Sequence, residues 1–314
     1  MKCLVTGAAG FVGINLCERL LNDEHDVIGI DNFIVSTPDE LMNTCGSHNN
    51  FHFHELDFTE KSSSFVFKNI DIIYHLGGMS GVRESILYPD VWFKNNVIGT
   101  FNILEMARLY NINKVVIASS SASIGDVDPP IHENIPMNPI SPYGASKGFK
   151  ELYASAYYHA YGIETSALRF SNVYGTHSTI KISLVAKFIR KIMKGEELNI
   201  YGSGKQTRDF IYVSDLVNAI IAAGDANVGG EIFQISTGVE TSVNEMVSCI
   251  CKVMKNYGFE IPKINYTDPA KGDIMTNYAI NEKARKMLKW EPFIDIENGL
   301  NETVKWFIKN EAIL

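Results

Sequence analysis

The chain has 314 residues, of which 46% are hydrophobic and 20% charged, and its formal net charge is −8. These values are typical of a globular protein and exclude a largely disordered one. No basic tract is interleaved with aromatic residues, which disfavours nucleic acid or an anionic membrane as a partner. No apolar run approaches the roughly 18 residues of a membrane-spanning helix, and glycines interrupt the N-terminus before a signal-peptide core could form.

The five cysteines are odd in number and lie mostly among apolar neighbours. Neither they nor the histidines have a spacing typical of a metal site. We therefore expect reduced thiols, no bound metal and a cytoplasmic location.

The first half of the chain alternates short apolar runs with segments of helical spacing. Strands are predicted at residues 2–6, 26–30, 51–56, 70–75, 114–118 and 165–170, and helices at residues 11–22, 91–110 and 143–160. Strands separated by helix-length segments indicate β-α-β units. The sequence therefore predicts an α/β protein with a doubly wound parallel sheet that helices cover on both faces.

After about residue 171 this alternation becomes irregular, and residues 198–213 (LNIYGSGKQTRDFIYV) resemble a β-hairpin. No linker, repeat or low-complexity segment separates the two halves. We predict a dinucleotide-binding Rossmann domain at residues 1–170. Residues 171–314 are expected to form mainly a smaller substrate-binding lobe, with segments that return to the first domain.

Three glycines, Gly7, Gly10 and Gly13, stand between the first predicted strand and the first predicted helix. In this position they allow a tight turn, a close approach to a pyrophosphate and close helix–strand packing. The alternative is an ordinary strand–helix turn. Asp31 ends the second predicted strand, where a carboxylate accepts hydrogen bonds from the adenosine ribose and repels a 2′-phosphate, which favours NAD over NADP. Asp57 either accepts from the adenine amino group or is a solvated carboxylate at a strand end.

Tyr143 and Lys147 are four residues apart in SPYGASK (141–147), so they share one face of a predicted helix. An ammonium beside a phenol, with the cationic nicotinamide ring nearby, lowers the phenol pKa toward neutrality and yields a usable base. The pair alone arises often by chance, but together with the glycine motif about 130 residues earlier it becomes a strong signal.

With these motifs the chain resembles the extended short-chain dehydrogenases/reductases, specifically the NAD-dependent nucleotide-sugar epimerase/dehydratase family that includes UDP-glucose 4-epimerase. The resemblance covers nearly the whole chain. It rests on VTGAAGFVG (5–13), IDNF (30–33), HLGGMSGVRES (75–85), NNVIGT (95–100), ASSSASIGD (118–126), SPYGASK (141–147), LRFSNVYG (168–175) and YGSGKQTRDFIYVSD (201–215).

The resemblance assigns a role to individual residues. It implies that the pyrophosphate of the cofactor binds Phe11 and Val12, and that the adenosine ribose binds Asp31 and Asn32. The adenine is expected between Asp57 and Phe58. The rest of the cofactor is expected along Leu76, Gly77 and Gly78, in a loop that Asn96 supports. Ser120 is expected to bridge the sugar hydroxyl and the Tyr143 oxygen, with Ser121 as the alternative if the motif is shifted by one. Asn172 and Arg208 are expected to bind the nucleotide-sugar diphosphate, although Arg208 could instead pair with Asp209 or Asp215.

Several positions depart from the family pattern. Thr176 and His177 replace a proline and an arginine, and Ala270 replaces an arginine that commonly binds the diphosphate. Lys271 or Lys181 could supply that charge instead. Asn277 falls where a residue gates the C2 substituent, and Arg83 either faces the sugar or pairs with Glu84.

The reaction expected from the resemblance is inversion of C4 of a nucleotide-diphosphate hexose, most simply a UDP-sugar, through a 4-keto intermediate. Related dehydratases and decarboxylases carry a carboxylate just after the catalytic hydroxyl residue, whereas this chain has Ser121-Ala122-Ser123. A dehydratase, a decarboxylase, a reductase and a catalytically idle NAD-sensing protein remain the alternatives. The helices near residues 91–110 and 143–160 are expected, by resemblance, to form a homodimer interface.

Overall fold

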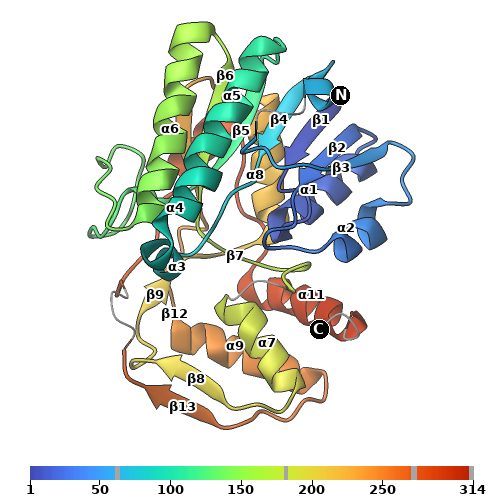
Figure 1. Ribbon diagram of the computed structural model, residues 1–314. Coiled ribbons are helices and arrows are strands. Elements are labelled where there is room, and N and C mark those ends of the chain that lie inside the picture. Colours follow the sequence, from blue (N-terminus) through green and yellow to red (C-terminus); the bar gives the residue numbers. More distant parts are fainter. Residues whose placement is uncertain (61–63, 180–182, 270–273, 311–314) are drawn as a thin grey trace.

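A seven-stranded parallel sheet, in the order β11-β6-β5-β4-β1-β2-β3, forms the centre of the upper lobe in Figure 1. The computed structural model describes residues 1–60, 64–179, 183–269 and 274–310. The α/β class with a doubly wound parallel sheet is confirmed. The strands of the sheet are β1 (Lys2–Thr6), β2 (Asp26–Asp31), β3 (Phe51–Glu55), β4 (Ile72–His75), β5 (Lys114–Ser120), β6 (Glu164–Phe170) and β11 (Glu231–Ile235).

Helices cover both faces of this sheet (Figure 1). One face carries α5 (Gly99–Leu109) and α6 (Pro142–Tyr161), and the other carries α1 (Phe11–Asn22) and α8 (Val213–Asp225), with α2 (Pro38–Cys45) against α1. Alternate strand residues supply the two cores: Val115 and Ile117 join the α5–α6 core, and Val116 joins the α1–α8 core. This alternation explains why the inner strands β1, β4 and β5 are largely apolar, whereas the edge strand β3 (FHFHE) is not.

The helix predicted at residues 91–110 exists but is not uniform. It consists of α4 (Pro89–Trp92), the π-helical segment η2 (Phe93–Ile98) and α5, preceded by the short α3 (Val82–Leu87). The π-helical turn buries Asn95 and Asn96. Such turns inside α-helices are frequent at functional sites, and the apolar spacing of the sequence does not reveal them.

The lower lobe of Figure 1 contains α7 (Leu184–Met193), α9 (Val243–Asn256) and three pairs of short strands, while α10 (Glu282–Leu288) and α11 (Ile296–Lys309) follow α9 in the chain. The expected hairpin at residues 198–213 is wrong, because its strands pair with distant segments rather than with each other. The pairs are β7 (Asn172–Tyr174) with β10 (Phe210–Tyr212), β8 (Leu198–Tyr201) with β13 (Ile264–Thr267), and β9 (Thr207–Arg208) with β12 (Thr241–Ser242).

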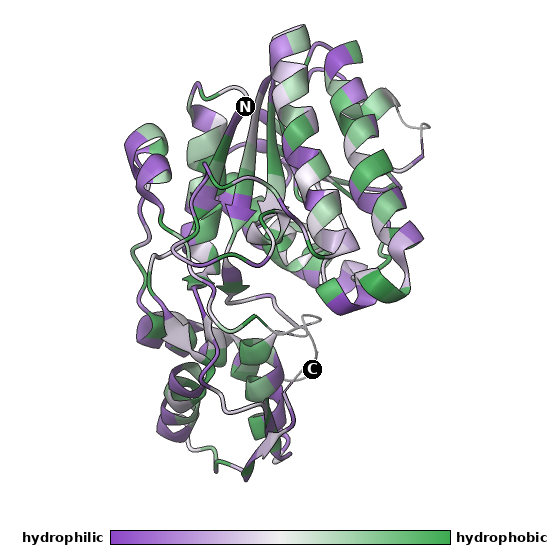
Figure 2. Ribbon diagram, turned by 90° about the vertical axis from the view of Figure 1, so that its left-hand side faces the viewer, coloured by the Kyte–Doolittle hydropathy of each residue, from purple (hydrophilic) through white to green (hydrophobic). Residues whose placement is uncertain are grey.

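Figure 2 shows hydrophobic residues along the central strands, and helices that carry both hydrophobic and hydrophilic residues. Two single turns of 3₁₀-helix, η1 (Ser64–Phe67) and η3 (Ser121–Ser123), connect larger elements. Among the described residues, no helix has the length and apolar character needed to cross a membrane.

Candidate active site

The loop between β1 and α1 brings the predicted glycines into close backbone contacts. Gly7 has a φ of +70°, and a Cβ at this position would lie 2.8 Å from Cα of Gly77. A Cβ at Gly13 would lie 2.0 Å from the carbonyl oxygen of Gly7. Any side chain at either position would therefore displace backbone. The bare loop that results has the shape a dinucleotide pyrophosphate requires, so these residues fit NAD.

The N-terminus of α1 and the end of β2 meet at this loop. Phe11 and Val12 form the first turn of α1, and its N-cap Gly10 has no side chain to cover the backbone N–H groups. A helix N-terminus of this kind attracts a phosphate. The buried carboxylate of Asp31 accepts a hydrogen bond from the N–H of Ala9 at 3.0 Å, which fixes the loop to the strand predicted to hold the ribose.

The residues expected around the adenosine also lie together. Asn32 follows β2, and its side chain hydrogen-bonds the carboxylate of Asp57 beyond β3. Burial raises the pKa of the Asp57 carboxyl, but the N–H of Thr59, which donates to it at 2.8 Å, and the side chains of Thr59 and Asn32 lower it, and its pKa lies below the usual range. The carboxylate is therefore ionised and able to accept a further hydrogen bond at neutral pH.

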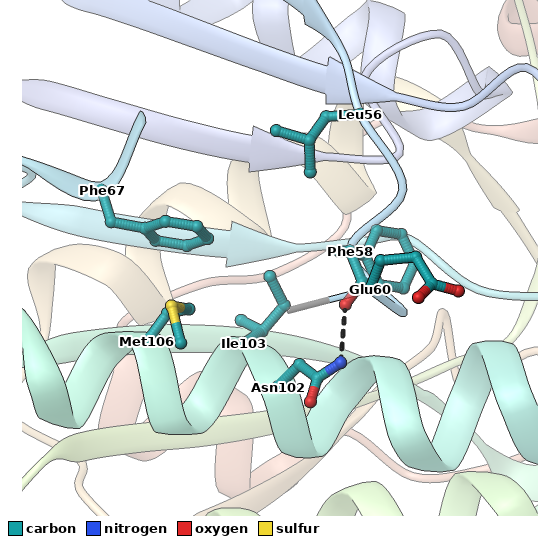
Figure 3. Close-up of a pocket in the computed structure, with 7 residues that line it drawn as sticks. All are labelled: Leu56, Phe58, Glu60, Phe67, Asn102, Ile103 and Met106. Atoms are coloured by element: carbon teal, nitrogen blue, oxygen red, sulfur yellow. Dashed lines mark hydrogen bonds between the residues drawn. The ribbon is translucent and has the colours of Figure 1, made fainter. Parts of the chain in front are cut away.

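Asn102 of α5 fixes the loop that carries Phe58. Its side-chain amide donates to the carbonyl oxygens of Phe58 (3.1 Å) and Thr59 (2.8 Å), and Figure 3 shows it pointing to this loop. The Phe58 ring packs edge-on against His75 at a centroid distance of 5.4 Å. A small cavity lies between this loop and α5, lined by Leu56, Phe58, Glu60, Phe67, Asn102, Ile103 and Met106 (Figure 3).

The loop after β4 carries Leu76, Gly77 and Gly78, the residues expected along the cofactor. Leu76 packs on the α1 side of the sheet, and Gly78 packs against the side chains of Asn96 and Lys150. Lys150 is fully buried, and its Nζ donates to the carbonyl oxygen of Gly77 at 2.9 Å. Asn96 donates to the carbonyl oxygen of Met79 and accepts from its N–H, as a residue that supports this loop should.

The predicted catalytic residues meet at the carboxyl end of β5. The phenol of Tyr143 on α6 lies near Ser120, the last residue of β5, close enough for the Ser120 side chain to lower the phenol pKa. The Lys147 Nζ lies 5.7 Å from the centroid of the Tyr143 ring and donates to the carbonyl oxygen of Ala118 at 3.1 Å. Ser85 of α3 accepts a hydrogen bond from the N–H of Tyr143 at 3.1 Å. Tyr143, Ser120 and Lys147 thus share one site next to the glycine loops.

The pKa shifts at this site have opposite signs. Burial lowers the pKa of Lys147 to about 8, against the opposing charge of Glu151. Burial raises the pKa of the Tyr143 phenol, and the hydrogen bond to Ser120 offsets only part of the rise. The phenol pKa is raised because removing a phenolate from water is costly. The sequence predicts a lowered pKa instead, and that prediction includes the positive charge of the nicotinamide ring.

The other serines of the ASSSAS segment point elsewhere. The Ser121 hydroxyl is buried and donates to Oε1 of Gln234 in β11 at 2.9 Å. Ser119 and Ser123 both donate to Glu151. Ser120 is therefore the better candidate for the hydroxyl that works with Tyr143.

Asn172 and Arg208, expected at the diphosphate, line the same pocket of about 210 Å³, together with Gln206, Leu184 and Val185. The Arg208 guanidinium donates to the carbonyl oxygen of Ile274 at 2.7 Å. The alternative ion pairs do not form in the part of the chain that the structure describes. Instead, the carboxylate of Asp209 accepts hydrogen bonds from the backbone N–H groups of Thr237 and Gly238. The carboxylate of Asp215 accepts them from the N–H groups of Phe293 and Ile294.

Asn277 is half-buried in the segment that follows Ile274, beside Arg208. Lys181 and Lys271, the proposed substitutes for the missing arginine, lie outside the described residues. His177 is buried, and its Nδ1 lies 2.8 Å from Oε1 of Glu40 in α2. His177 therefore joins the segment after β7 to the sheet lobe.

Comparison with known proteins identifies the family. The model of the NAD dependent epimerase/dehydratase family matches residues 3–236. The chain belongs to this family. Similar proteins include the UDP-glucose 4-epimerase of Mycolicibacterium smegmatis (33% identical, 98% of each chain) and the UDP-glucuronate 4-epimerase of Thermodesulfobacterium geofontis (34% identical, 99% of this chain and 97% of that one). The crystal structure of the UDP-glucuronic acid 4-epimerase of Bacillus cereus with UDP-glucuronic acid and NAD has a TM-score of 0.90 and 28% identity, and covers 98% of this chain and 99% of that one.

The family assignment and NAD as the cofactor are thereby confirmed. Three positioning residues of this site, Ser85, Asn102 and Lys150, were not found by sequence reasoning. In the sequence each of them is only a polar residue on the side of a helix that faces the core. This pattern does not show which group the side chain binds.

Proposed function

We propose that this member of the family is an epimerase that inverts C4 of a nucleotide-diphosphate hexose, with a UDP-sugar as substrate, through a transient 4-keto sugar. The observation that carries the proposal is the grouping of Tyr143 and Ser120 beside Lys147, next to the Asn172–Arg208 pocket. Ser120 pairs across the sheet with Phe170, two residues before Asn172, so the hydroxyl pair and the pocket adjoin. This edge of a doubly wound sheet is where ligands bind.

In this proposal Tyr143 removes the proton of the 4-hydroxyl, and Ser120 orients that hydroxyl by hydrogen bonding. A bound NAD, held by the glycine loops and Asp31, would supply the hydride acceptor and donor for C4. Lys147 lowers the energy of the phenolate by its charge, while Asn172 and Arg208 hold the diphosphate as the keto sugar turns within the pocket. The net reaction consumes no cofactor.

The lack of an acid–base carboxylate beside Ser120 supports epimerisation over elimination or decarboxylation. The carboxylate that does reach Ser123 belongs to Glu151, and it is fully buried and bound to Arg169 at 2.7 Å. Its two oxygens are already occupied by hydrogen bonds from Ser119, Ser123 and Arg169. The intact set of Tyr143, Lys147 and Ser120 also favours an enzyme over an idle NAD-sensing protein.

The test is incubation of the purified protein with UDP-glucose, UDP-glucuronate or UDP-N-acetylglucosamine, without added cofactor, and detection of the products by NMR. The expected product is the C4 epimer of at least one of these sugars. Accumulation of a 4-keto-6-deoxy sugar, release of carbon dioxide or a continuous need for NADPH would contradict the proposal. Tight NAD binding without turnover of any nucleotide sugar would instead indicate an idle protein.

Asn277 is proposed to gate the C2 substituent of the sugar. A side chain of this size leaves more room than tyrosine, so 2-acetamido sugars are expected to be accepted. Asn277→Tyr should lower turnover of UDP-N-acetylglucosamine relative to UDP-glucose. An unchanged ratio would show that the position does not gate.

A homodimer through α5 and α6 is proposed as the assembled form. Large apolar residues are exposed on these helices, including Leu109, Leu152 and Tyr161. Exposed apolar surface of this kind commonly marks an interface. Sedimentation as a monomer at micromolar concentration would contradict the dimer. The cytoplasmic location stays a prediction.

A further inference from the structure

Two cations lie against one aromatic ring between the two lobes. Arg83 belongs to α3 of the sheet lobe, whereas Lys187 on α7 and Tyr201 at the end of β8 belong to the lower lobe (Figure 1). The Arg83 Cζ is 5.9 Å and the Lys187 Nζ 5.8 Å from the centroid of the Tyr201 ring. The ring is 45% exposed, so a ligand can reach it.

No described residue neutralises the two positive charges by an ion pair. Within residues 1–60, 64–179, 183–269 and 274–310, neither Arg83 nor Lys187 forms an ion pair, and the predicted alternative pairing of Arg83 with Glu84 is absent. Each cation–π contact at such a site contributes only about 0.5–1 kcal/mol. An anion bound at this ring lies close to both cations and gains Coulomb attraction from each.

The cluster adjoins the proposed active site on two sides. Arg83 lies two residues before Ser85, which binds the backbone N–H of the catalytic Tyr143. The carbonyl oxygen of Tyr201 accepts from the side chain of Gln206 at 2.8 Å, and Gln206 lines the Asn172–Arg208 pocket. Val185, two residues before Lys187 on α7, lines the same pocket.

We propose that Arg83 and Lys187, with the ring of Tyr201, form an anion-binding subsite of the cleft, additional to the Asn172–Arg208 pocket, for an oxyanion of the bound nucleotide sugar. The oxyanion is either the carboxylate of a hexuronic acid or the diphosphate. A guanidinium fork matches the two oxygens of a carboxylate or phosphate, and the lysine adds a point charge. The proposal rests on the nucleotide-sugar substrate proposed above and specifies the class of that substrate.

The experiment measures binding, not turnover, with NAD-loaded Tyr143→Phe protein as the background. Calorimetry measures the Kd of UDP, UDP-glucose and UDP-glucuronate for the Tyr143→Phe protein. The same three values are measured after Arg83→Gln or Lys187→Gln is added to it. Arg285→Gln and Lys252→Gln are matched controls, because they remove the same charges from exposed residues paired with Glu291 and Glu297.

If the subsite takes a sugar carboxylate, both cleft variants weaken UDP-glucuronate by at least about tenfold more than UDP-glucose. If it takes the diphosphate, they weaken all three ligands equally. The controls should leave every Kd within about twofold of the background. If Arg83→Gln and Lys187→Gln also leave the Kd of all three ligands within about twofold of the Tyr143→Phe value, the proposal is wrong. A separate turnover assay of the unmodified chain distinguishes this failure from failure of the epimerase proposal.

Discussion

The sheet lobe and the lower lobe are built from contacts of different range. In the sheet, β1 to β6 are apolar strands joined by helices, and most lie beside a strand that is close in sequence. In the lower lobe, strands of two to four residues pair with segments far along the chain, as β8 does with β13. Periodic patterns reveal the first kind of structure, whereas the second forms only when distant segments meet.

This difference separates the proposed roles of the two lobes. The sheet lobe supplies the glycine loops, Asp31 and the Tyr143–Ser120 pair, all at ends of predicted strands or helices. The lower lobe supplies Arg208 and Lys187. Substitutions of the glycine loops, Asp31 or the Tyr143–Ser120 pair should therefore change chemistry or cofactor preference, whereas those of Arg208 and Lys187 should change substrate affinity alone.

The largest effect is expected for Tyr143→Phe. Loss of the phenolic hydroxyl removes the general base, so turnover should fall by about 10³–10⁴-fold. The Kd of NAD should stay within about threefold, because the ring and Lys147 remain. The measurement is single-turnover kinetics with calorimetry of NAD binding. Turnover within tenfold of the unmodified chain would place the base elsewhere.

A large loss of stability is expected for Glu151→Ala in the sheet lobe. Its partner Arg169 has a side chain only 1% exposed, and an unpaired charge at such a site costs about 3–5 kcal/mol. The control is Glu291→Ala, whose ion pair with Arg285 is exposed and should contribute at most about 1 kcal/mol. Urea unfolding of both variants tests this difference, and equal losses would contradict it.

In the lower lobe, Arg208→Gln should weaken nucleotide-sugar binding by about 10–100-fold through loss of a charged hydrogen bond. NAD affinity should not change, because the cofactor residues belong to the other lobe. Calorimetry with UDP and with NAD provides both values. A matching loss of NAD affinity would show that the two lobes do not act separately.

Asp31→Ala tests the cofactor preference of the sheet lobe. The unmodified chain should bind NAD more tightly than NADP, because the carboxylate repels a 2′-phosphate. The substitution should lower NAD affinity by about tenfold and narrow the gap between the two cofactors. Equal affinity of the unmodified chain for NAD and NADP would show that Asp31 is not at the ribose.

The smallest effect concerns His177, which connects the lobes. Burial lowers its pKa, but hydrogen bonds and charges from Glu18 and Glu40 raise it, and the net shift is upward. Protonated His177 thus stabilises the folded state below the ordinary histidine pKa, and this contribution is lost as the pH rises through the raised value.

His177→Gln should therefore lower the unfolding free energy by about 1 kcal/mol more at pH 6 than at pH 8.5. Thermal unfolding across this pH range checks the difference. His52→Gln, at an exposed position, is the control and should show no such trend. A loss that does not depend on pH would mean that the histidine acts only by packing.

The sequence by itself determined the α/β class, the family, NAD as the cofactor and the places of six of the seven sheet strands, because each depends on local periodicity or on a motif of nearby residues; β11 was not predicted. It also supplied Tyr143, Lys147 and Ser120 as candidates. It favoured Ser120 over Ser121 only by the position of the motif, since neighbouring residues at a strand end differ mainly in where their side chains point. That choice depends on Gln234, which reaches Ser121 from a strand more than 100 residues later.

Only the tertiary structure decided which short strands pair in the lower lobe: β7 with β10, β8 with β13 and β9 with β12. It also decided that Asn102 and Lys150 support the loops after β3 and β4, and that Arg83 meets Tyr201. Each of these joins residues that are distant in the chain, and a polar side chain gives no sign in the sequence of the partner it will find. Which partner it meets is set by how the helices and the two lobes pack, because burial of apolar surface determines that packing and polar groups pair within it.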